Sequence, residues 1–244
     1  MLKLITKENQ FHQTIFGGRF QTNKPVKYGA MPHVAPYSSI FYWSHGVALE
    51  DVEFPLHPHE GFEIMSFVIS GENLHYDTET HVWTPLYTGD FQVIQANSGV
   101  SHSEKILKGT RAFQIWFDPN FRNALQKTAT YADYKAADFK PEIYENGIET
   151  TTYVGATTGA KADTEGLKIQ RISFVGEKTI HLDSNSTYGF YLLDGTCTTN
   201  GAKLEANDAL MIEGETSVTL DLAPSSSFFV IKMPIKPTYQ TVWI

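Results

Sequence analysis

Short apolar segments that end at glycine-containing turns constrain the fold of this chain more than any other feature. Residues 63–69 form an apolar run that stops at Ser70-Gly71-Glu72, and residues 91–94 follow the turn Thr88-Gly89-Asp90. Further runs of this kind occupy residues 112–117, 167–174, 190–193, 209–212, 218–220 and 228–231. Short runs at nearly regular spacing, in a chain rich in aromatic residues, predict β-strands. The sequence therefore predicts an all-β sandwich or barrel.

The order of strands and turns occurs twice along the chain. Residues 67–71 parallel residues 191–195, and the later turns Gly89-Asp90 and Asn207-Asp208 each precede another apolar run. Such a repeat is typical of a duplicated domain, although matches of this quality also arise by chance between strand-rich segments. The stretch 120–139 is rich in Ala, Lys and Gln, and it predicts an irregular link with at most one short helix.

Composition and charge argue against several classes of protein. The formal net charge is −8 and the sequence has no local basic patch, which argues against direct binding to nucleic acid. The one cysteine, Cys197, excludes an intrachain disulfide and the Cys-rich zinc scaffolds. No apolar run approaches the ~18 residues of a membrane span, and the N-terminus lacks the apolar stretch of a signal peptide. We therefore expect a cytoplasmic protein with no membrane segment.

Two pairs of polar side chains carry the chemistry expected of this chain. His57 and His59 lie two residues apart, as do His102 and Glu104. Residues two apart in an extended strand face the same side, so each pair presents two ligands together. If both segments line one barrel, three imidazoles and one carboxylate converge, a set that suits Fe, Mn, Ni, Cu or Zn. An octahedral metal held in this way keeps two open positions for substrate or oxygen.

Other residues compete for these roles. Glu63 lies four residues after His59 and shares its face in an unbroken strand, so it is an alternative to Glu104 as the carboxylate ligand. A bulge at Gly61 would change that parity. His75 is a further candidate for the same cavity, although a strand histidine bonded to a neighbour is the commoner situation.

The second half of the chain offers no comparable ligand set. Aligning the two repeats places His181 opposite His57, and it places apolar or small residues near Leu220 opposite His102 and Glu104. We therefore expect the second copy of the repeat to be free of metal.

The segments around these residues resemble the pirin family of the cupin superfamily. The resemblance rests on residues 57–63, on residues 68–71 with His75 and Asp77, and on residues 89–92, 99–104 and 114–116. It is strong from about residue 54 to residue 117, and after Asp118 only the order of strands supports it. The His-Pro-His and His-Ser-Glu motifs are specific together, whereas either one alone is not.

The resemblance implies a bicupin, an all-β chain with two double-stranded β-helix barrels of the jelly-roll type. On this basis residues 1–125 form an N-terminal barrel with the metal site, residues 126–160 form a link, and residues 161–244 form a degenerate barrel without metal. The resemblance assigns the ligand roles to His57, His59, His102 and Glu104. It favours Fe(II) as the metal, with Mn, Ni, Cu and Zn as alternatives.

The resemblance also implies a function. Some bacterial pirin-like proteins act as quercetin 2,3-dioxygenases, so the first hypothesis is a metal-dependent dioxygenase that cleaves the ring of a flavonol-like substrate. Glu104 would then serve as both ligand and general base. The alternative is a non-catalytic metal or redox sensor that binds a protein partner, and a third hypothesis is a relic whose metal site has no present role. A pocket beside the metal that admits a flavonol favours the enzyme, whereas a sealed site favours the binding module.

Overall fold

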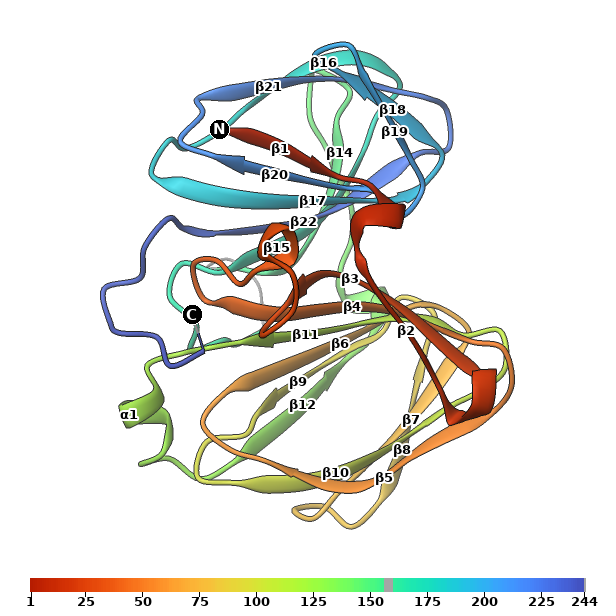
Figure 1. Cartoon of the computed structure of the whole chain (residues 1–244), viewed down its shortest axis with the longest axis vertical. Helices are drawn as coiled ribbons and strands as arrows, with labels where there is room; N and C mark the ends of the chain where they lie inside the picture. Colours follow the sequence, from red (N-terminus) through yellow and green to blue (C-terminus); the bar gives the residue numbers. More distant parts are fainter. Residues whose placement is uncertain (156–159, 244) are drawn as a thin grey trace. The chain divides into compact units, whose positions relative to one another are not determined.

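The computed structural model describes residues 1–155 and 160–243, which form two units built almost entirely of β-strands (Figure 1). The N-terminal unit comprises Phe11–Asp138, Ala162–Thr164 and Thr238–Ile244. The C-terminal unit comprises Met1–Gln10, Phe139–Lys161 and Glu165–Pro237. Strands make up 56% of the structure and helices 7%, which confirms the prediction of an all-β fold.

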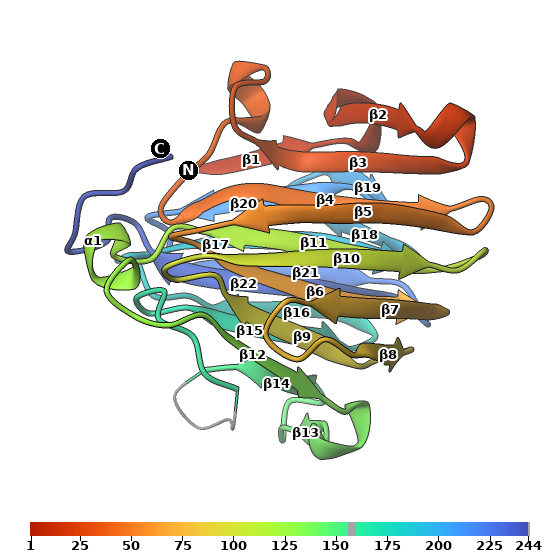
Figure 2. The same ribbon diagram turned by 90° about the horizontal axis from the view of Figure 1, so that it is seen from below.

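The N-terminal unit consists of a seven-stranded and a four-stranded antiparallel sheet. The strand order is β12-β9-β6-β11-β4-β3-β2 in the larger sheet and β5-β10-β7-β8 in the smaller one (Figures 1 and 2). The elements are β2 (Phe11–Ile15), β3 (Phe20–Lys27), β4 (Ile40–Ala48), β5 (Val52–His59), β6 (Glu63–Ser70), β7 (Glu72–Asp77), β8 (Trp83–Tyr87), β9 (Phe91–Gln95), β10 (Val100–Ile106), β11 (Arg111–Phe117), the short helix α1 (Phe121–Ala124) and β12 (Thr130–Tyr134).

The C-terminal unit has the same composition of sheets. Its strand order is β1-β20-β17-β22-β15-β14-β13 in the larger sheet and β16-β21-β18-β19 in the smaller one. The strands are β1 (Leu2–Ile5), β13 (Glu142–Ile143), β14 (Glu149–Val154), β15 (Lys168–Ser173), β16 (Gly176–His181), β17 (Ser186–Asp194), β18 (Thr196–Thr199), β19 (Ala202–Glu205), β20 (Ala209–Glu213), β21 (Ser217–Leu222) and β22 (Ser227–Pro234). Strict alternation in β21 buries Val218, Leu220 and Leu222 in one apolar core, because successive strand residues face opposite sides.

The two glycines of the sequence repeat occupy equivalent turns. Gly71 and Gly195 both have positive φ angles, 93° and 79°. At each turn a hydroxyl oxygen from a later segment, that of Thr110 or Ser226, accepts a hydrogen bond from the backbone N–H that follows the glycine, at 3.0 and 3.1 Å. A Cβ on either glycine would lie 2.7 Å from the Cα of Thr110 or the Cβ of Ser226, so each turn requires the smallest residue.

The aspartate turns of the repeat also match in detail. The carboxylate of Asp90 accepts a hydrogen bond from the backbone N–H of Tyr87 at 3.1 Å, and that of Asp208 accepts one from Glu205 at 2.8 Å. In both units a strand then begins and pairs with the glycine-terminated strand, β9 with β6 and β20 with β17. The same bonds at the same steps of the chain support an internal duplication rather than a chance match.

Segments from the two ends and from the middle of the chain contribute to both units. Strand β12 pairs with β9 in the N-terminal unit, and β1 takes the corresponding place beside β20 in the C-terminal unit. Residues 126–160, expected as a link, thus carry β12, β13 and β14, while residues 156–159 lie outside the described part of the chain. The segment Thr238–Ile244 belongs to the N-terminal unit, where the carboxylate of Asp118 accepts the backbone N–H groups of Val242 and Trp243.

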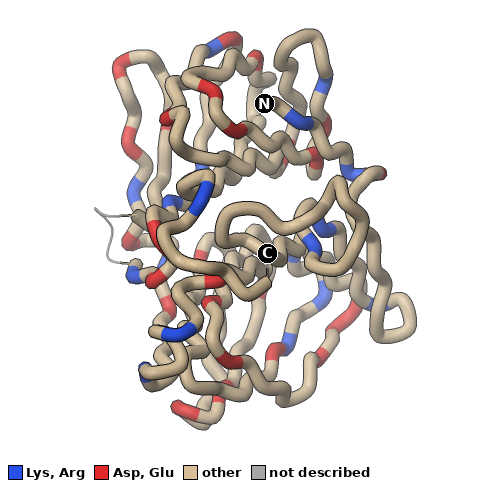
Figure 3. The backbone as a smooth tube through the Cα atoms, turned by 60° about the vertical axis from the view of Figure 1, so that its left-hand side comes forward, with Lys and Arg blue, Asp and Glu red and all other residues tan. Residues whose placement is uncertain are grey.

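Charged residues are dispersed over both units. Lys and Arg positions are interspersed with Asp and Glu positions along the backbone (Figure 3). Among the described residues, no helix has the length and apolar character needed to span a membrane.

Candidate metal centre

Three histidines of the N-terminal unit point their Nε2 atoms at one another. The Nε2 atom of His102 lies 3.0 Å from that of His57 and 3.0 Å from that of His59, and the ligand atoms of all three residues lie within 4.8 Å. Two metal–nitrogen bonds of about 2.1 Å at a right angle place their nitrogens about 3.0 Å apart. The spacing therefore suits three adjacent positions of an octahedral metal, and the cluster can hold a metal ion.

A β-bulge turns His57 into the barrel. His102 pairs with His57 across strands β10 and β5, whereas Glu104, two residues further, pairs with Phe54 three residues earlier. The extra residue in β5 changes which side chains face inward, so that Leu56 is exposed and His57 reaches His102. The bulge also supplies an acceptor, because the Nδ1 atom of His57 lies 2.7 Å from the carbonyl oxygen of Pro55. A hydrogen bond from Nδ1 to that carbonyl leaves the Nε2 lone pair free for a metal.

The environment keeps two of the histidines neutral. Burial, together with the charges that the neighbouring imidazoles would carry, lowers the pKa of His59 and of His102 to about 3. The ring of His59 packs edge-on against Phe62 and Trp116, with centroids 5.1 and 5.5 Å apart. Because a metal binds neutral imidazole, these two residues are ready for coordination without releasing a proton.

Glu104 lies beside this cluster but is not part of it. It is buried on β10, and its Oε2 atom accepts a hydrogen bond from the Nε2 atom of Gln114 at 2.7 Å. Gln114 is oriented in turn by the indole N–H of Trp116, 3.2 Å from its Oε1 atom. The charge of Glu104 opposes the lowering of the His59 pKa, which places the carboxylate within electrostatic reach of the cluster. The role of Glu104 as the fourth ligand stays a prediction.

Glu63, the alternative carboxylate, is engaged elsewhere in the same unit. Its two oxygens accept hydrogen bonds from the side chain of Gln95, from the backbone N–H groups of Asp163 and Thr164, and from the hydroxyl of Thr164. These four bonds hold the segment 162–164 against β6. They use the lone pairs that a metal ligand would need, so the geometry favours Glu104 over Glu63.

His75 faces the same interior, and two of the residues near it, Tyr131 and Asp133, were missed by sequence reasoning. Its ring lies 5.3 Å from that of His102 and stacks on Tyr131 at 5.3 Å. The Nε2 atom of His75 lies 3.3 Å from a carboxylate oxygen of Asp77, and the hydroxyl of Tyr131 donates to Asp133 at 2.7 Å. Tyr131 and Asp133 belong to β12, whose weak apolar pattern gave little sign of a strand; only its alternation could have revealed it.

Two hollows border the centre. A cavity of about 270 Å³ has Glu104 and Gln114 in its wall, and an open depression of about 470 Å³ has His59 and Glu60 in its wall. Ligand pockets commonly measure roughly 300–1,000 Å³, so the cavity beside Glu104 suits a compact ligand. The site is therefore not sealed by side chains.

The second copy of the repeat carries apolar residues at the ligand positions. Val218 and Leu220 on β21 correspond to His102 and Glu104, and Val218 pairs with Ile180 on β16. Ile180, rather than the exposed His181, thus corresponds to His57, because the bulge adds one residue to β5 but none to β16. The expected match of His181 with His57 is wrong by one residue. Side chains of this kind offer no ligand atom to a metal.

Gly61 fixes the turn that follows the first histidine pair, which makes it a test of the local geometry. Its φ is +80°, and a Cβ there would lie 2.1 Å from the ring of Phe121. We expect Gly61→Ala to lower the free energy of unfolding by about 2 kcal/mol and to weaken metal binding by displacing His59. Gly109 is a matched control, because its φ is +83° and no atom lies within 4 Å of an added Cβ.

Gly109→Ala should cost only about 1 kcal/mol of backbone strain and leave metal affinity unchanged. Urea denaturation and metal titration of both variants measure these effects. Equal losses in the two variants would show that the contact with Phe121 does not position the turn.

Comparison with known proteins shows that the sequence of this chain is similar to pirin-like proteins. The family model described as Pirin matches residues 19–117. A pirin-like protein from Caulobacter vibrioides is 27% identical over 78% of this chain and 81% of its own length. A putative quercetin 2,3-dioxygenase from Pseudomonas aeruginosa is 26% identical over 83% of this chain and 86% of its own length.

Solved structures share the whole fold. The bacterial pirin YhhW from Escherichia coli, in complex with nickel(II), superposes with a TM-score of 0.80 at 20% identity, covering 96% of this chain and 99% of that one. A quercetin 2,3-dioxygenase from Acinetobacter baumannii superposes with a TM-score of 0.79 at 18% identity, covering 96% and 79%. The fold is a bicupin, as expected from the sequence.

Proposed function

We propose that this chain is a metal-dependent dioxygenase of the pirin family that cleaves the ring of a flavonol-like aromatic substrate. The observation that carries the proposal is the convergence of the Nε2 atoms of His57, His59 and His102, with His59 in the wall of an open depression and the buried carboxylate of Glu104 in the wall of a cavity. The name of one relative supports the same class of reaction, since the protein from Pseudomonas aeruginosa is named a putative quercetin 2,3-dioxygenase.

The three histidines and Glu104 are the residues that would hold the metal. Three nitrogens and one oxygen, with no thiolate, suit Fe, Mn, Ni, Cu or Zn, and the resemblance to the pirin family favours Fe(II) among them. Such a metal supplies Lewis acidity, which favours the anionic form of a bound hydroxyl group.

Glu104 is positioned to move the proton of the substrate. Its carboxylate borders the cavity, and Gln114 donates to only one of its two oxygens. The other oxygen can accept the proton of the substrate hydroxyl, and positioned bases of this kind contribute roughly 10²–10⁴-fold to rate. Gln114 is a positioning residue, because it holds the carboxylate at a fixed angle to the cavity.

The space beside the histidines supports an enzyme rather than a non-catalytic sensor. A metal or redox sensor needs no hollow beside its ligands, whereas here an open depression of about 470 Å³ has His59 in its wall. No observation on the described residues points to a particular protein partner, so the sensor is an outcome of the test below.

Oxygen uptake with quercetin tests the proposal. We expect the metal-loaded protein to consume oxygen and release CO well above the background of free metal, and Glu104→Gln to lower the rate by about 10²-fold or more. Glu53→Gln is the matched control, because Glu53 is an exposed carboxylate of β5 that pairs with Lys105 outside the site. Uptake no greater than that of free metal, or equal rates for Glu104→Gln and the unchanged protein, would remove the dioxygenase proposal and leave the sensor.

A further inference from the structure

The cavity beside Glu104 extends under the β2–β3 hairpin. Its wall includes residues from β2, β3, β4, β10 and β11 of the N-terminal unit. The hairpin forms the edge of the larger sheet (Figure 2), and the exposed Gln13 lies at this edge of the cavity. The cavity therefore has Glu104 in one part of its wall and the hairpin in another.

A buried ammonium group from the hairpin lines this cavity. Lys24 is only 2% exposed, and one of its N–H groups donates to the Oε1 atom of Gln13. The rings of Phe11 and Tyr42 lie 5.4 and 5.5 Å from its Nζ atom. Among the described residues no carboxylate lies within 4 Å of that atom, so the charge has no counter-ion. Lysine is almost never buried unless it is paired.

Three further polar atoms in the cavity wall lack partners. The hydroxyls of Thr22 and Ser66 and the Oδ1 atom of Asn73 make no hydrogen bond within the described part of the chain, and all three residues are more than nine-tenths buried. Buried polar groups in proteins nearly always have partners. Their presence together with Lys24 points to a polar ligand that satisfies them.

The rest of the wall is apolar and in part aromatic. Phe20, Phe54 and Phe113 line the cavity, together with Ile15 and Ile106. Surfaces of this kind accommodate a flat ring, because aromatic faces and edges pack closely on one another. The cavity thus combines a place for one ring, a cation and a carboxylate that adjoins the metal centre.

We propose that Lys24 binds the carboxylate group of a compact aromatic ligand whose ring fills this cavity and whose other end reaches Glu104. The inference rests on the proposed function for the role of Glu104, but the contact with Lys24 does not depend on the reaction. It names the ligand of this cavity as an aromatic acid of about one ring, a smaller molecule than the flavonol of the proposed function, because the volume is about 270 Å³.

The charge of Lys24 gives the interaction a pH dependence. Burial, with a smaller contribution from the charge of Lys27, lowers the pKa of Lys24 to about 8. The ammonium is therefore present at pH 7 and is lost above about pH 8. Of the groups that face it, Tyr42 stays neutral because burial raises its pKa to about 12, and Glu104 and Lys27 are the other charged groups near the cavity among the described residues.

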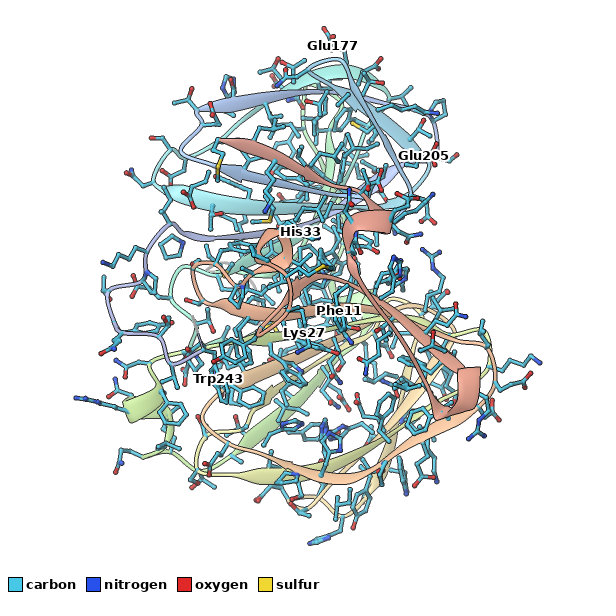
Figure 4. All side chains as sticks on the ribbon, in the orientation of Figure 1. Phe11, Lys27, His33, Glu177, Glu205 and Trp243 are labelled. Atoms are coloured by element: carbon cyan, nitrogen blue, oxygen red, sulfur yellow. The ribbon has the colours of Figure 1, made fainter. Side chains whose placement is uncertain are left out.

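Calorimetric titration with benzoate and its neutral analogue benzamide tests the proposal. We expect the metal-loaded protein to bind benzoate at least tenfold more tightly than benzamide at pH 7, with the preference falling as the pH rises through about 8. Lys24→Met should weaken benzoate binding at least tenfold and leave benzamide binding unchanged. Lys27→Met is the matched control, because Lys27, labelled in Figure 4, lies on the same strand and does not line the cavity, and it should retain benzoate affinity within about twofold.

Two further measurements separate this inference from the proposed function. Metal content is measured for all variants, and benzoate titration is repeated on the metal-free protein. Benzoate binding that is lost in Lys24→Met supports the inference even if the loaded protein takes up no oxygen with any substrate. Equal affinity of the unchanged protein and Lys24→Met for benzoate, or equal affinity for benzoate and benzamide, overturns it even if oxygen uptake is observed.

Discussion

His102→Ala is expected to abolish tight metal binding, with a loss of affinity of more than about 100-fold. The Nε2 atom of His102 lies 3.0 Å from those of both His57 and His59, so it is the central member of the three-histidine cluster. Even partners that only orient a ligand commonly contribute 10–100-fold to affinity, and losing the ligand itself costs more. The measurement is metal content after dialysis, followed by competition with a chelator of known affinity.

Two other histidines give matched controls for this loss. His181→Ala removes an exposed imidazole of β16 and should leave metal content unchanged. His75→Ala removes the buried ring 5.3 Å from that of His102 and should weaken binding by about 10-fold, since His75 packs beside the ligand without reaching the cluster. A full equivalent of tightly bound metal in His102→Ala would show that the three-histidine cluster is not the binding site.

Sequence spacing alone could point to the candidate ligands, because it depends on chemistry that only a few residues can supply. The pairs His57/His59 and His102/Glu104 stand out at spacings that a strand brings to one side. Spacing did not reveal the bulge that turns His57 inward, since two residues between Phe54 and His57 look like an ordinary strand. It also gave no means of choosing between Glu63 and Glu104. That choice depends on the hydrogen bonds that segment 162–164 makes to Glu63, a hundred residues away in the sequence.

The fold could also be predicted only in part. Short apolar runs and glycine turns indicate strands locally, and the matched turns at Gly71 and Gly195 indicate a duplication. Pairing between distant segments is not encoded in such patterns. Strand β1 pairs with β20, more than 200 residues later, in the position that β12 occupies in the other unit. The burial of Lys24 could not be predicted either. A lysine in a strand is ordinarily exposed, and only the folded hairpin buries this one.

Lys24→Met is expected to make the protein more stable, by about 2–3 kcal/mol at pH 7. Lowering the pKa of a lysine from 10.5 to about 8 corresponds to about 3 kcal/mol that the folded state spends on holding the charge. The variant loses the hydrogen bond to Gln13, which offsets about 1 kcal/mol of the gain. Met has a similar length and no charge, so it fills the same space among the rings of Phe11 and Tyr42.

The sign of the pH dependence distinguishes this account from simple repacking. Between about pH 8 and pH 10.5 the unfolded state keeps a proton on Lys24 that the folded state has released, so the unchanged protein gains stability as the pH rises through this window. The Met variant has no such gain. Its higher free energy of unfolding, relative to the unchanged protein, should be fully present below pH 8 and should vanish near pH 10.5. Urea denaturation at a series of pH values measures both curves.

A variant less stable than the unchanged protein at pH 7 would mean that contacts within the cavity already compensate the ammonium, and Lys24 would then be a structural residue. Higher stability combined with lost benzoate binding has a different meaning. A buried charge that lowers the stability of the folded state is commonly found at a residue that binds a ligand. Binding and stability then place opposite demands on that residue. Benzoate itself should reverse the order of stability, since it binds the folded form of the unchanged protein and supplies the counter-ion that Lys24 lacks.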